Sequence, residues 1–513
     1  MTKHKHDYRN IGNRKWWAIG AISLAAIAFG LDLTVLNLAL PTLSTALHAS
    51  TSQLEWIVAA YSLALSVMLL PAGLLGDRFG RKKVILFALT LFGVSSLACA
   101  YSTSAGQLIA ARVALGIGGA FILPLGLSTL TVFFNDKERP KALGLLFGAN
   151  FASFPLGPIL GGWLLTHYWW GSVFLINIPV VIVAIIAIAI LLPESRAHHK
   201  PKLDISGLVL ASLGITSITY GAVEAEFKGW GSPEVLILLV LGAILLAWFY
   251  RVERWKMRHK HRPLVDLKLF DSKGFLWGAI LTTGLSFAIF GLFFTIPQFF
   301  QSAEGKSALA AGYRLLPMVG GLIIGTVLAT RLARTIGTKI PVALGFAAVA
   351  AGLIIGASTK LGSSDLFVIT WIAIIGVGMG LVMPPAVNAA LDALSPESSG
   401  VGSSVLQAMR QVGSTLGVAV LGSIVGASYR SQLHLQEFPH AVAVTIQGGV
   451  TAGVVVAEKL KLSTLLNDVR VAFVHSMDVL LIVCAGIAIV SVILTLIFLP
   501  NRPVVAKSQK NID

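Results

Sequence analysis

A carboxylate and a guanidinium stand inside long apolar stretches of the first part of the sequence, at Asp32 and Arg112. A charge buried in a membrane costs about 2.5–3.5 kcal/mol on insertion scales, so such residues are usually functional. A buried aspartate can load and release a proton, because desolvation favours its neutral form and a nearby cation favours its charged form. At 1.5 Å per residue, the two side chains lie at similar depths in their helices. We predict that Asp32 and Arg112 form a proton-coupling pair; the alternatives are a structural hydrogen bond for Asp32 and an Arg112 that snorkels to the outer interface.

Membrane-spanning helices must position this pair. The chain has 513 residues, of which 56% are hydrophobic and only 12% charged, whereas soluble domains have about 25% charged residues. Apolar runs of about 20 residues, long enough to cross ~30 Å of hydrocarbon, recur along the sequence, and only helices satisfy the backbone there. We predict an all-α polytopic membrane protein with fourteen spans near residues 16–39, 54–74, 84–101, 107–130, 141–164, 171–193, 203–223, 234–250, 275–298, 309–330, 338–358, 366–388, 400–427 and 476–499.

The basic residues are distributed unequally between the two sets of loops. The set that includes both termini holds 29 of the 39 Lys and Arg residues, and the opposite set holds eight. This bias predicts a multi-pass protein of the cell membrane with both termini in the cytoplasm. The net charge of +16 is explained by this topology, so we expect membrane lipid and no nucleic acid as a partner.

Glycine and proline positions repeat between the two ends of the chain. Gly116, Gly118 and Pro124 recur 260 residues later, and so do Gly157 and Gly162. Both copies run in the same direction, which predicts a parallel repeat with substrate bound between two halves. We therefore expect two six-helix halves with an inserted helix pair, divided as a cytoplasmic N-terminus 1–15, a first half 16–193, an inserted pair 203–250, a basic cytoplasmic loop 251–274, a second half 275–499 with a long outer loop 429–474, and a tail 500–513.

Two short motifs carry further information. The turn after the second span contains charged residues that could latch one conformation and release in another, namely Gly73, Asp77, Arg78, Gly80, Arg81 and Lys82. The alternative for this turn is a plain basic loop. The fifth span is rich in small residues that let helix backbones approach closely, with Ser153, Gly157, Pro158, Gly161 and Gly162 as its motif. The alternative there is ordinary helix packing.

Aromatic and polar residues in the spans are candidates for a substrate pocket, since aromatic rings attract lipophilic cations. These candidates are Thr34, Asn37, Trp56, Tyr61, Asn150, Phe151, Phe294, Gln298, Asn388, Gln407 and Arg410. The sequence contains no Walker loop, no nucleophile elbow and no metal-spaced His/Cys set. We therefore expect neither catalytic residues, nor a metal, nor a cofactor; a membrane enzyme or a non-transporting sensor is a further alternative.

On these motifs, residues 20–500 resemble the fourteen-span drug:H+ antiporter-2 family of the major facilitator superfamily, which includes quaternary-ammonium and multidrug exporters. The resemblance implies a bacterial, monomeric antiporter that exports hydrophobic drugs or biocides in exchange for protons and confers antibiotic resistance. Ala59, Leu406, Gln407 and Gln411 stand where the dication-exporting branch has acids. We therefore expect cationic or neutral substrates and about one proton per cycle; the alternative is a dedicated exporter of one endogenous metabolite, lipid or antibiotic.

Overall fold

The structure is a computed structural model that describes residues 14–135, 138–196, 204–259, 263–392, 394–395 and 399–501. Within these ranges, fourteen helical segments are long and apolar enough to cross a membrane. The prediction of an all-α fold with fourteen spans is therefore confirmed. The predicted segments 1–15 and 500–513 lie almost wholly outside the described residues, and so does part of the basic loop, at 260–262.

The first half of the bundle contains six spans, two of which are interrupted. The fourth span is divided at Ala120 and Phe121, where Gly118, Gly119 and Pro124 all fall within about two turns. The helices of this half are α1 (Arg14–Ala46), α2 (Thr51–Phe79), α3 (Arg81–Ala100), α4 (Ala105–Gly119), α5 (Ile122–Phe133), α6 (Arg139–His167), α7 (Ser172–Leu175) and α8 (Asn177–Leu191).

The inserted pair and the second half follow. The inserted pair is α9 (Ile205–Lys228) and α10 (Pro233–Arg258). A 3₁₀ turn, η2 (Leu267–Asp271), leads into the second half, which contains α11 (Lys273–Gln298), the π turn η3 (Phe299–Ala303), α12 (Ala308–Thr335), α13 (Lys339–Gly356), α14 (Asp365–Leu391), α15 (Ser399–Gln432), α16 (His440–Gln447), α17 (Val450–Lys459) and α18 (Ser463–Phe498).

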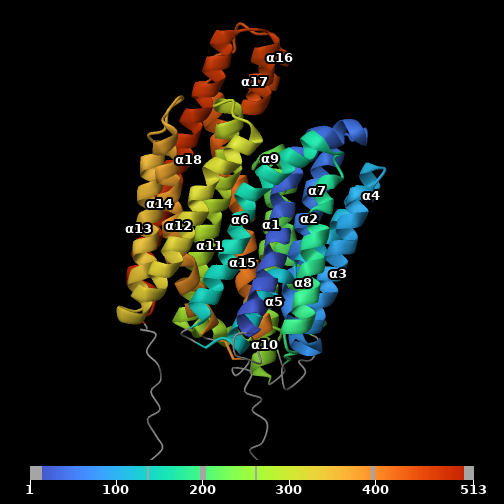
Figure 1. Cartoon of the computed structure of the whole chain (residues 1–513), viewed down its shortest axis with the longest axis vertical. Helices are drawn as coiled ribbons and strands as arrows, with labels where there is room; N and C mark the ends of the chain where they lie inside the picture. Colours follow the sequence, from blue (N-terminus) through green and yellow to red (C-terminus); the bar gives the residue numbers. More distant parts are fainter. Residues whose placement is uncertain are drawn as a thin grey trace, which may run out of the picture.

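Equivalent helices pack in equivalent ways in the two halves. In the first half α1 packs on α6 and α2 on α4, while in the second half α11 packs on α15 and α12 on α14. The halves meet through α6 against α12 and through α2 against α15. The inserted helix α9 covers α2 and α15, so the inserted pair lies at one edge of the contact between the halves. Figure 1 shows these helices side by side in one bundle.

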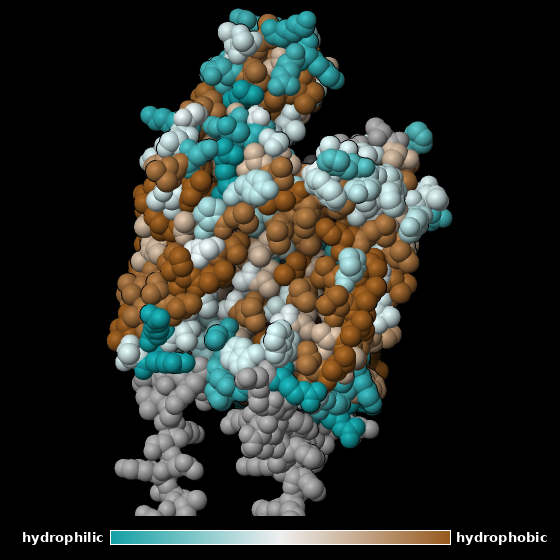
Figure 2. Space-filling model, viewed as in Figure 1, coloured by the Kyte–Doolittle hydropathy of each residue, from teal (hydrophilic) through white to brown (hydrophobic). Residues whose placement is uncertain are grey.

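The end of the bundle that carries α16 and α17, at the top of Figure 1, is called here the outer end, and the opposite end the cytoplasmic end, following the predicted orientation. Hydrophobic side chains cover the face seen in Figure 2 between these two polar ends. Four helices that run inward from the outer end begin at serine N-caps, which satisfy otherwise unpaired backbone N–H groups: Ser50, Ser104, Ser307 and Ser364.

The segment 429–474, predicted as a long outer loop between two spans, contains α16, α17 and the first turns of α18. The last span, predicted at 476–499, belongs to a helix that begins at Ser463. Polar residues such as Arg470 lower the hydropathy of its first turns, but Leu465 and Val469 are buried and keep the helix packed on α17. The helix therefore extends beyond the apolar part of the span. The α16–α17 pair projects from the bundle (Figure 1).

Candidate functional site

A buried ion pair between Asp32 and Arg112 joins α1 to α4. Arg112 Nη1 donates a hydrogen bond to Asp32 Oδ2 at 2.6 Å, and neither side chain is more than 2% exposed. Arg112 Nε donates to the backbone oxygen of Ile57 at 3.1 Å, and the guanidinium lies 4.3 Å from the ring centre of Tyr61. Arg112 therefore points into the first half toward Asp32, and the structure brings together the two residues whose depths match in the sequence.

The small residues of α6 allow α1 to approach closely. A Cβ added at Gly157 would lie 2.7 Å from Thr34 Cβ, and a Cβ added at Gly161 would lie 2.9 Å from Val35 Cγ1. Contacts this short would force the helices apart, so glycine is required at these two positions while the helices keep this spacing. The glycines of α6 therefore set the position of the helix that carries Asp32.

Polar candidates along the contact between α1 and α6 are engaged with backbone oxygens. Thr34 Oγ1 donates to carbonyl oxygens of its own helix, and Asn150 Nδ2 donates to the carbonyl oxygen of Ala26 at 3.2 Å. Ser153 Oγ donates to the carbonyl oxygen of Asn150 at 2.5 Å. Asn37 lies in α1, but its side chain is outside the described part of the structure. Thr34, Asn150 and Ser153 thus reinforce the packing that surrounds Asp32.

The opposite face of α6 packs against α12 of the second half. A Cβ added at Gly162 would lie 3.4 Å from Ala308 Cβ, and one added at Gly312 would lie 2.9 Å from the carbonyl oxygen of Pro155. Pro158 lies within α6, which continues as one helix through it. The same motif therefore faces both α1 and the other half.

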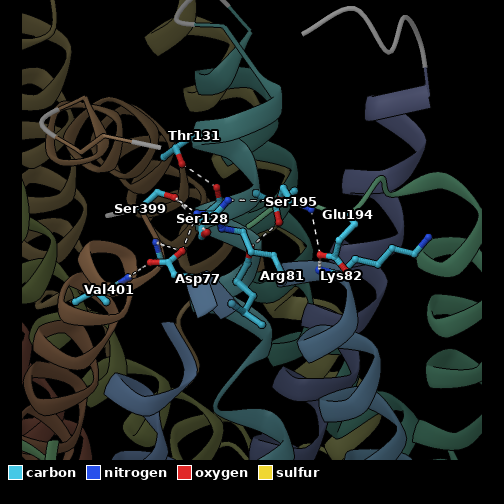
Figure 3. Close-up of polar contacts among 12 residues, drawn as sticks. Asp77, Arg81, Lys82, Ser128, Thr131, Glu194, Ser195, Ser399 and Val401 are labelled. Carbon is cyan, nitrogen blue, oxygen red and sulfur yellow. Dashed lines mark hydrogen bonds and ion pairs between the residues drawn. The ribbon is translucent and has the colours of Figure 1, made fainter. Parts of the chain in front are cut away.

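At the cytoplasmic end, Asp77 of α2 holds the N-terminus of α15 (Figure 3). Its two carboxylate oxygens accept hydrogen bonds from the backbone N–H groups of Gly400 and Val401, both at 3.1 Å. Arg81 Nη2 donates to Asp77 Oδ1 and to Ser399 Oγ, both at 2.7 Å. The carboxylate is also favoured by the partial positive charge at a helix N-terminus. Asp77 and Arg81 thus tie the first half to the second.

The remaining residues of this turn position Asp77 and Arg81. Gly80 has a φ of 107°, a conformation that favours glycine, where the chain turns from α2 into α3. Glu194 accepts hydrogen bonds from the backbone N–H groups of Lys82 and Lys83 at 3.1 and 3.3 Å (Figure 3). Arg78 lies in the last turn of α2. The glutamate therefore caps the N-terminus of α3, a role that the sequence analysis does not assign to it.

An ion pair also crosses between the halves at the cytoplasmic end. Arg139 Nη1 donates to Asp392 Oδ1, and Asn388 Nδ2 donates to Asp392 Oδ2 at 3.1 Å. Gly73 faces Gly400 so closely that a Cβ would lie 2.5 Å from the carbonyl carbon. The cytoplasmic ends of the halves are therefore in contact. Asp392 is not among the residues predicted from the sequence. It follows the twelfth span as the loop of Arg139 follows the fourth, and these spans correspond in the repeat.

Four phenylalanines form a cluster between the halves: Phe151 and Phe154 of α6, and Phe290 and Phe293 of α11. The rings of Phe154 and Phe293 stack with their centres 3.9 Å apart and their planes at 8°. Phe290 meets Phe154 edge-on at 5.5 Å, and Phe151 lies 6.3 Å from Phe293. Only Phe151 is among the predicted pocket residues. This phenylalanine cluster is a buried aromatic contact between α6 and α11, that is, between the two halves.

Three of the predicted pocket residues lie away from the phenylalanine cluster. Trp56 is 41% exposed and contacts Tyr220 of α9, with ring centres 5.8 Å apart. Phe294 faces Gly422 of α15. Gln298 donates to the carbonyl oxygen of Phe294 and lines an outer hollow beside α17. Adjacent residues on a helix point about 100° apart, so Phe293 reaches the cluster while Phe294 does not.

Arg410 of α15 is buried near the same interface. It is 5% exposed, and its guanidinium lies 4.8 Å from the ring centre of Phe147 on α6. Its Nη1 donates to Gln407 Oε1 at 3.0 Å, and its Nε contacts Ser286 Oγ at 3.4 Å. Gln407 and Arg410 are thus neighbours that face the first half.

In the part of the chain that the structure describes, no three His, Cys, Asp or Glu side chains are grouped so that they could hold a metal ion. The expectation that the protein needs neither a metal nor another cofactor stays a prediction.

Comparison with known proteins identifies the family of this chain. Residues 22–418 match the family model described as Major Facilitator Superfamily. The chain belongs to the Major Facilitator Superfamily. Its likeness to a solved superfamily structure, the human organic anion transporter MFSD10, has a TM-score of 0.58 at 14% identity, and covers 94% of this chain and 100% of that one. At this identity the likeness shows the fold alone.

Relatives within the superfamily are drug exporters and resistance proteins. The chain is 32% identical to the tetracenomycin C resistance and export protein of Streptomyces glaucescens, over 81% of this chain and 76% of the relative. It is 32% identical to the methyl viologen resistance protein SmvA of Salmonella typhimurium, over 82% of this chain and 85% of the relative. The chain is therefore a multi-pass efflux transporter of the superfamily's drug-resistance type.

Proposed function

We propose that this efflux transporter is a proton-coupled antiporter that exports hydrophobic drugs or biocides by alternating access. The observation that carries the proposal is the Asp32–Arg112 ion pair, which lies in the spans at a contact of 2.6 Å. A proton that binds Asp32 removes the negative charge that holds Arg112. The strength of the contact between α1 and α4 therefore depends on the protonation of Asp32, which is the requirement for coupling a proton to a conformational change.

The contacts at the cytoplasmic end distinguish the two states of this cycle, one closed to the cytoplasm and one open to it. In the described conformation, Asp77 holds α15 and Arg139 pairs with Asp392, so the cytoplasmic ends are closed. Release of these contacts would open a path from the cytoplasm to the phenylalanine cluster. We propose that substrate enters from the cytoplasm after this release and leaves from the outer end after the contacts form again.

The proton gradient supplies enough free energy for export. A proton that enters down a potential of 100 mV yields about 2.3 kcal/mol, and one pH unit adds about 1.4 kcal/mol. One proton per cycle can therefore sustain a ratio of about 500-fold across the membrane for a neutral substrate. We propose one proton per cycle, with the protein acting as a monomer in the bacterial cell membrane and both termini in the cytoplasm.

The names of two relatives support substrates with aromatic rings. One relative exports tetracenomycin C and another confers resistance to methyl viologen. We propose that aromatic rings of a substrate contact the phenylalanine cluster when the two halves separate. Whether one compound or many are exported separates the two functions that the sequence leaves open, a multidrug exporter and a dedicated exporter.

Transport into proteoliposomes with a pH dye inside tests the proposal. Purified protein is given a pH gradient and, in turn, ethidium, rhodamine 6G, norfloxacin and chloramphenicol. We expect proton movement with several of these compounds; a response to one alone would favour a dedicated exporter, and substrate movement without a proton signal would contradict proton coupling. Asp32→Asn should lose the proton signal, and the exposed control Asp271→Asn should keep it. An unchanged pH dependence of transport in Arg112→Ala would argue against coupling between Asp32 and Arg112.

A further inference from the structure

Arg410 differs from the other buried arginines of the described residues in having no acidic partner. Arg81, Arg112 and Arg139 each form an ion pair with an aspartate. Arg410 is equally buried, but its hydrogen-bond partners, Gln407 and Ser286, are both neutral. A buried charge without a counter-ion is unfavourable, so a protein that keeps one usually has a use for it.

The guanidinium of Arg410 also retains donors for a ligand. A guanidinium carries five N–H donors in a planar fork, and the hydrogen bonds to Ser286 and Gln407 engage only Nε and Nη1. Nη2 makes no hydrogen bond to a described residue. An oxygen of a bound molecule could therefore accept from this edge without displacing Gln407 or Ser286.

The position of Arg410 places these donors at one end of the phenylalanine cluster. Arg410 lies against Phe147 on α6 and Ser286 on α11. The cluster residues Phe154 and Phe293 each follow seven positions later on the same two helices, which is roughly 10 Å farther toward the outer end. A flat molecule of three or four fused rings has a similar length, so it could stack on the cluster while one end reaches Arg410.

The charges in this region do not favour a cation. The carboxylate of Asp32 is engaged by Arg112. Asp478, on α18, has a buried Oδ1 with no hydrogen-bond partner, and it is not within ion-pair distance of Arg410. The interface between the halves near the phenylalanine cluster therefore presents one guanidinium without a counter-ion.

We propose that Arg410 binds an anionic or strongly hydrogen-bond-accepting oxygen, such as a sulfonate, carboxylate, phenolate or quinone oxygen, on substrates whose aromatic rings stack on the phenylalanine cluster. This inference rests on the proposed export function, because it names the substrate class of that site. The sequence favours cationic or neutral substrates. With this role of Arg410, the expected substrates are neutral compounds that carry a hydrogen-bond acceptor, together with aromatic anions.

Three pyrene derivatives with one ring system and different charges test this inference. They are 1-pyrenesulfonate, which is an anion, 1-pyrenemethanol, which is neutral, and 1-pyrenemethylamine, which is a cation at neutral pH. Binding is measured by fluorescence anisotropy with the full-length protein in nanodiscs, with empty nanodiscs as the blank. The wild type should bind the sulfonate more tightly than the cation; equal or tighter binding of the cation would overturn the proposal without any variant.

Substitution of Arg410 gives the second test. Arg410→Gln should weaken sulfonate binding by roughly 10- to 100-fold, the range for one lost hydrogen bond to a charged group, and leave 1-pyrenemethanol within about twofold. Arg410→Lys keeps the charge and should retain part of the sulfonate affinity even if the glutamine variant does not fold. The matched control is Arg430→Gln, an exposed arginine on the same helix, which should change none of the three affinities.

Two results would contradict this role of Arg410. One is sulfonate binding that is unchanged in Arg410→Gln, and the other is an equal loss for all three probes, which would show a purely structural role. The measurement needs no proton gradient, so it separates the two proposals. Charge-selective binding without proton-linked transport would overturn only the coupling, and proton-linked transport without charge selectivity would overturn only the substrate class.

Discussion

Replacement of Asp77 by asparagine should open the cytoplasmic end of the protein. Asp77 accepts two backbone hydrogen bonds from the N-terminus of α15 and one from Arg81. An asparagine side chain has a single acceptor oxygen, and its amide nitrogen would face a backbone N–H group that it cannot bind. The substitution therefore removes one hydrogen bond between the halves, weakens the other by removing its charge, and leaves Arg81 without its ion pair.

The size of this effect follows from the two contacts that cross between the halves. Hydrogen bonds to charged groups contribute about 1.5–3 kcal/mol each. Loss of one such bond and weakening of the other should disfavour the cytoplasm-closed state by about 2–4 kcal/mol, which is a shift of roughly 30- to 1000-fold in the equilibrium between closed and open states. Arg139 and Asp392 still join the halves, so the folded bundle itself should persist.

Distances between two spin labels at the cytoplasmic end measure this shift. Exposed Lys83 on α3 and exposed Lys273 on α11 provide one label site in each half. The wild type should show mainly the short distance, and Asp77→Asn should show mainly the long one. Asp271→Asn, which removes an exposed carboxylate at the same end, is the control. If Asp77→Asn keeps the distance distribution of the wild type, Asp77 does not act as a latch.

Two further predictions concern other contacts. Gly157→Ala should lower export in a vesicle assay at least about tenfold while the protein still reaches the membrane, because the new methyl group would overlap Thr34 on α1 and overpacking costs about 1–3 kcal/mol. Gly148→Ala, whose Cβ would meet nothing nearer than 3.6 Å, is the control and should stay active. Equal activity of the two variants would contradict this prediction. Burial alone would raise the pKa of Asp204, but hydrogen bonds from Lys256, the Gly207 N–H and Ser206 hold that pKa below its ordinary value. Its charged form therefore stabilises the fold above the ordinary pKa of about 3.9, and this contribution is lost as the pH falls through the lower, folded-state pKa. Asp204→Asn should thus lower the unfolding temperature at pH 7, with a difference from wild type that shrinks toward pH 3; a constant difference would show that charge is not its cause.

The sequence predicts those parts of the site that depend on position along a helix. The depths of Asp32 and Arg112 follow from the regular helical rise, and the structure places the two side chains in contact. The charged turn around Asp77 can be located because its glycine and charged residues form one local string. The contact of Asp77 with Gly400 and Val401 could not be predicted, because it depends on how the two halves dock.

Features that depend on helix rotation are less accessible from the sequence. Phe293 and Phe294 are equally apolar neighbours, and only the packing of α11 decides that Phe293 joins the phenylalanine cluster. Hydropathy does not locate the start of α18 at Ser463, because it identifies the apolar part of a helix that lies in the membrane and not the polar turns that precede it. No local sequence pattern marks Asp392, which follows the twelfth span. Its ion pair with Arg139 could be predicted from the repeat only if the equivalent loops of the two halves were known to face each other.

Proton release on substrate binding is the sharpest test of the role proposed for Asp32. Purified protein in weakly buffered detergent solution, with a pH indicator, is mixed with the compound that gives the largest proton signal in proteoliposomes. We expect release of about one proton per wild-type molecule and none from Asp32→Asn, with binding of the compound retained in both. Release of a full proton from Asp32→Asn would contradict the account, because the exchanged proton would then reside elsewhere.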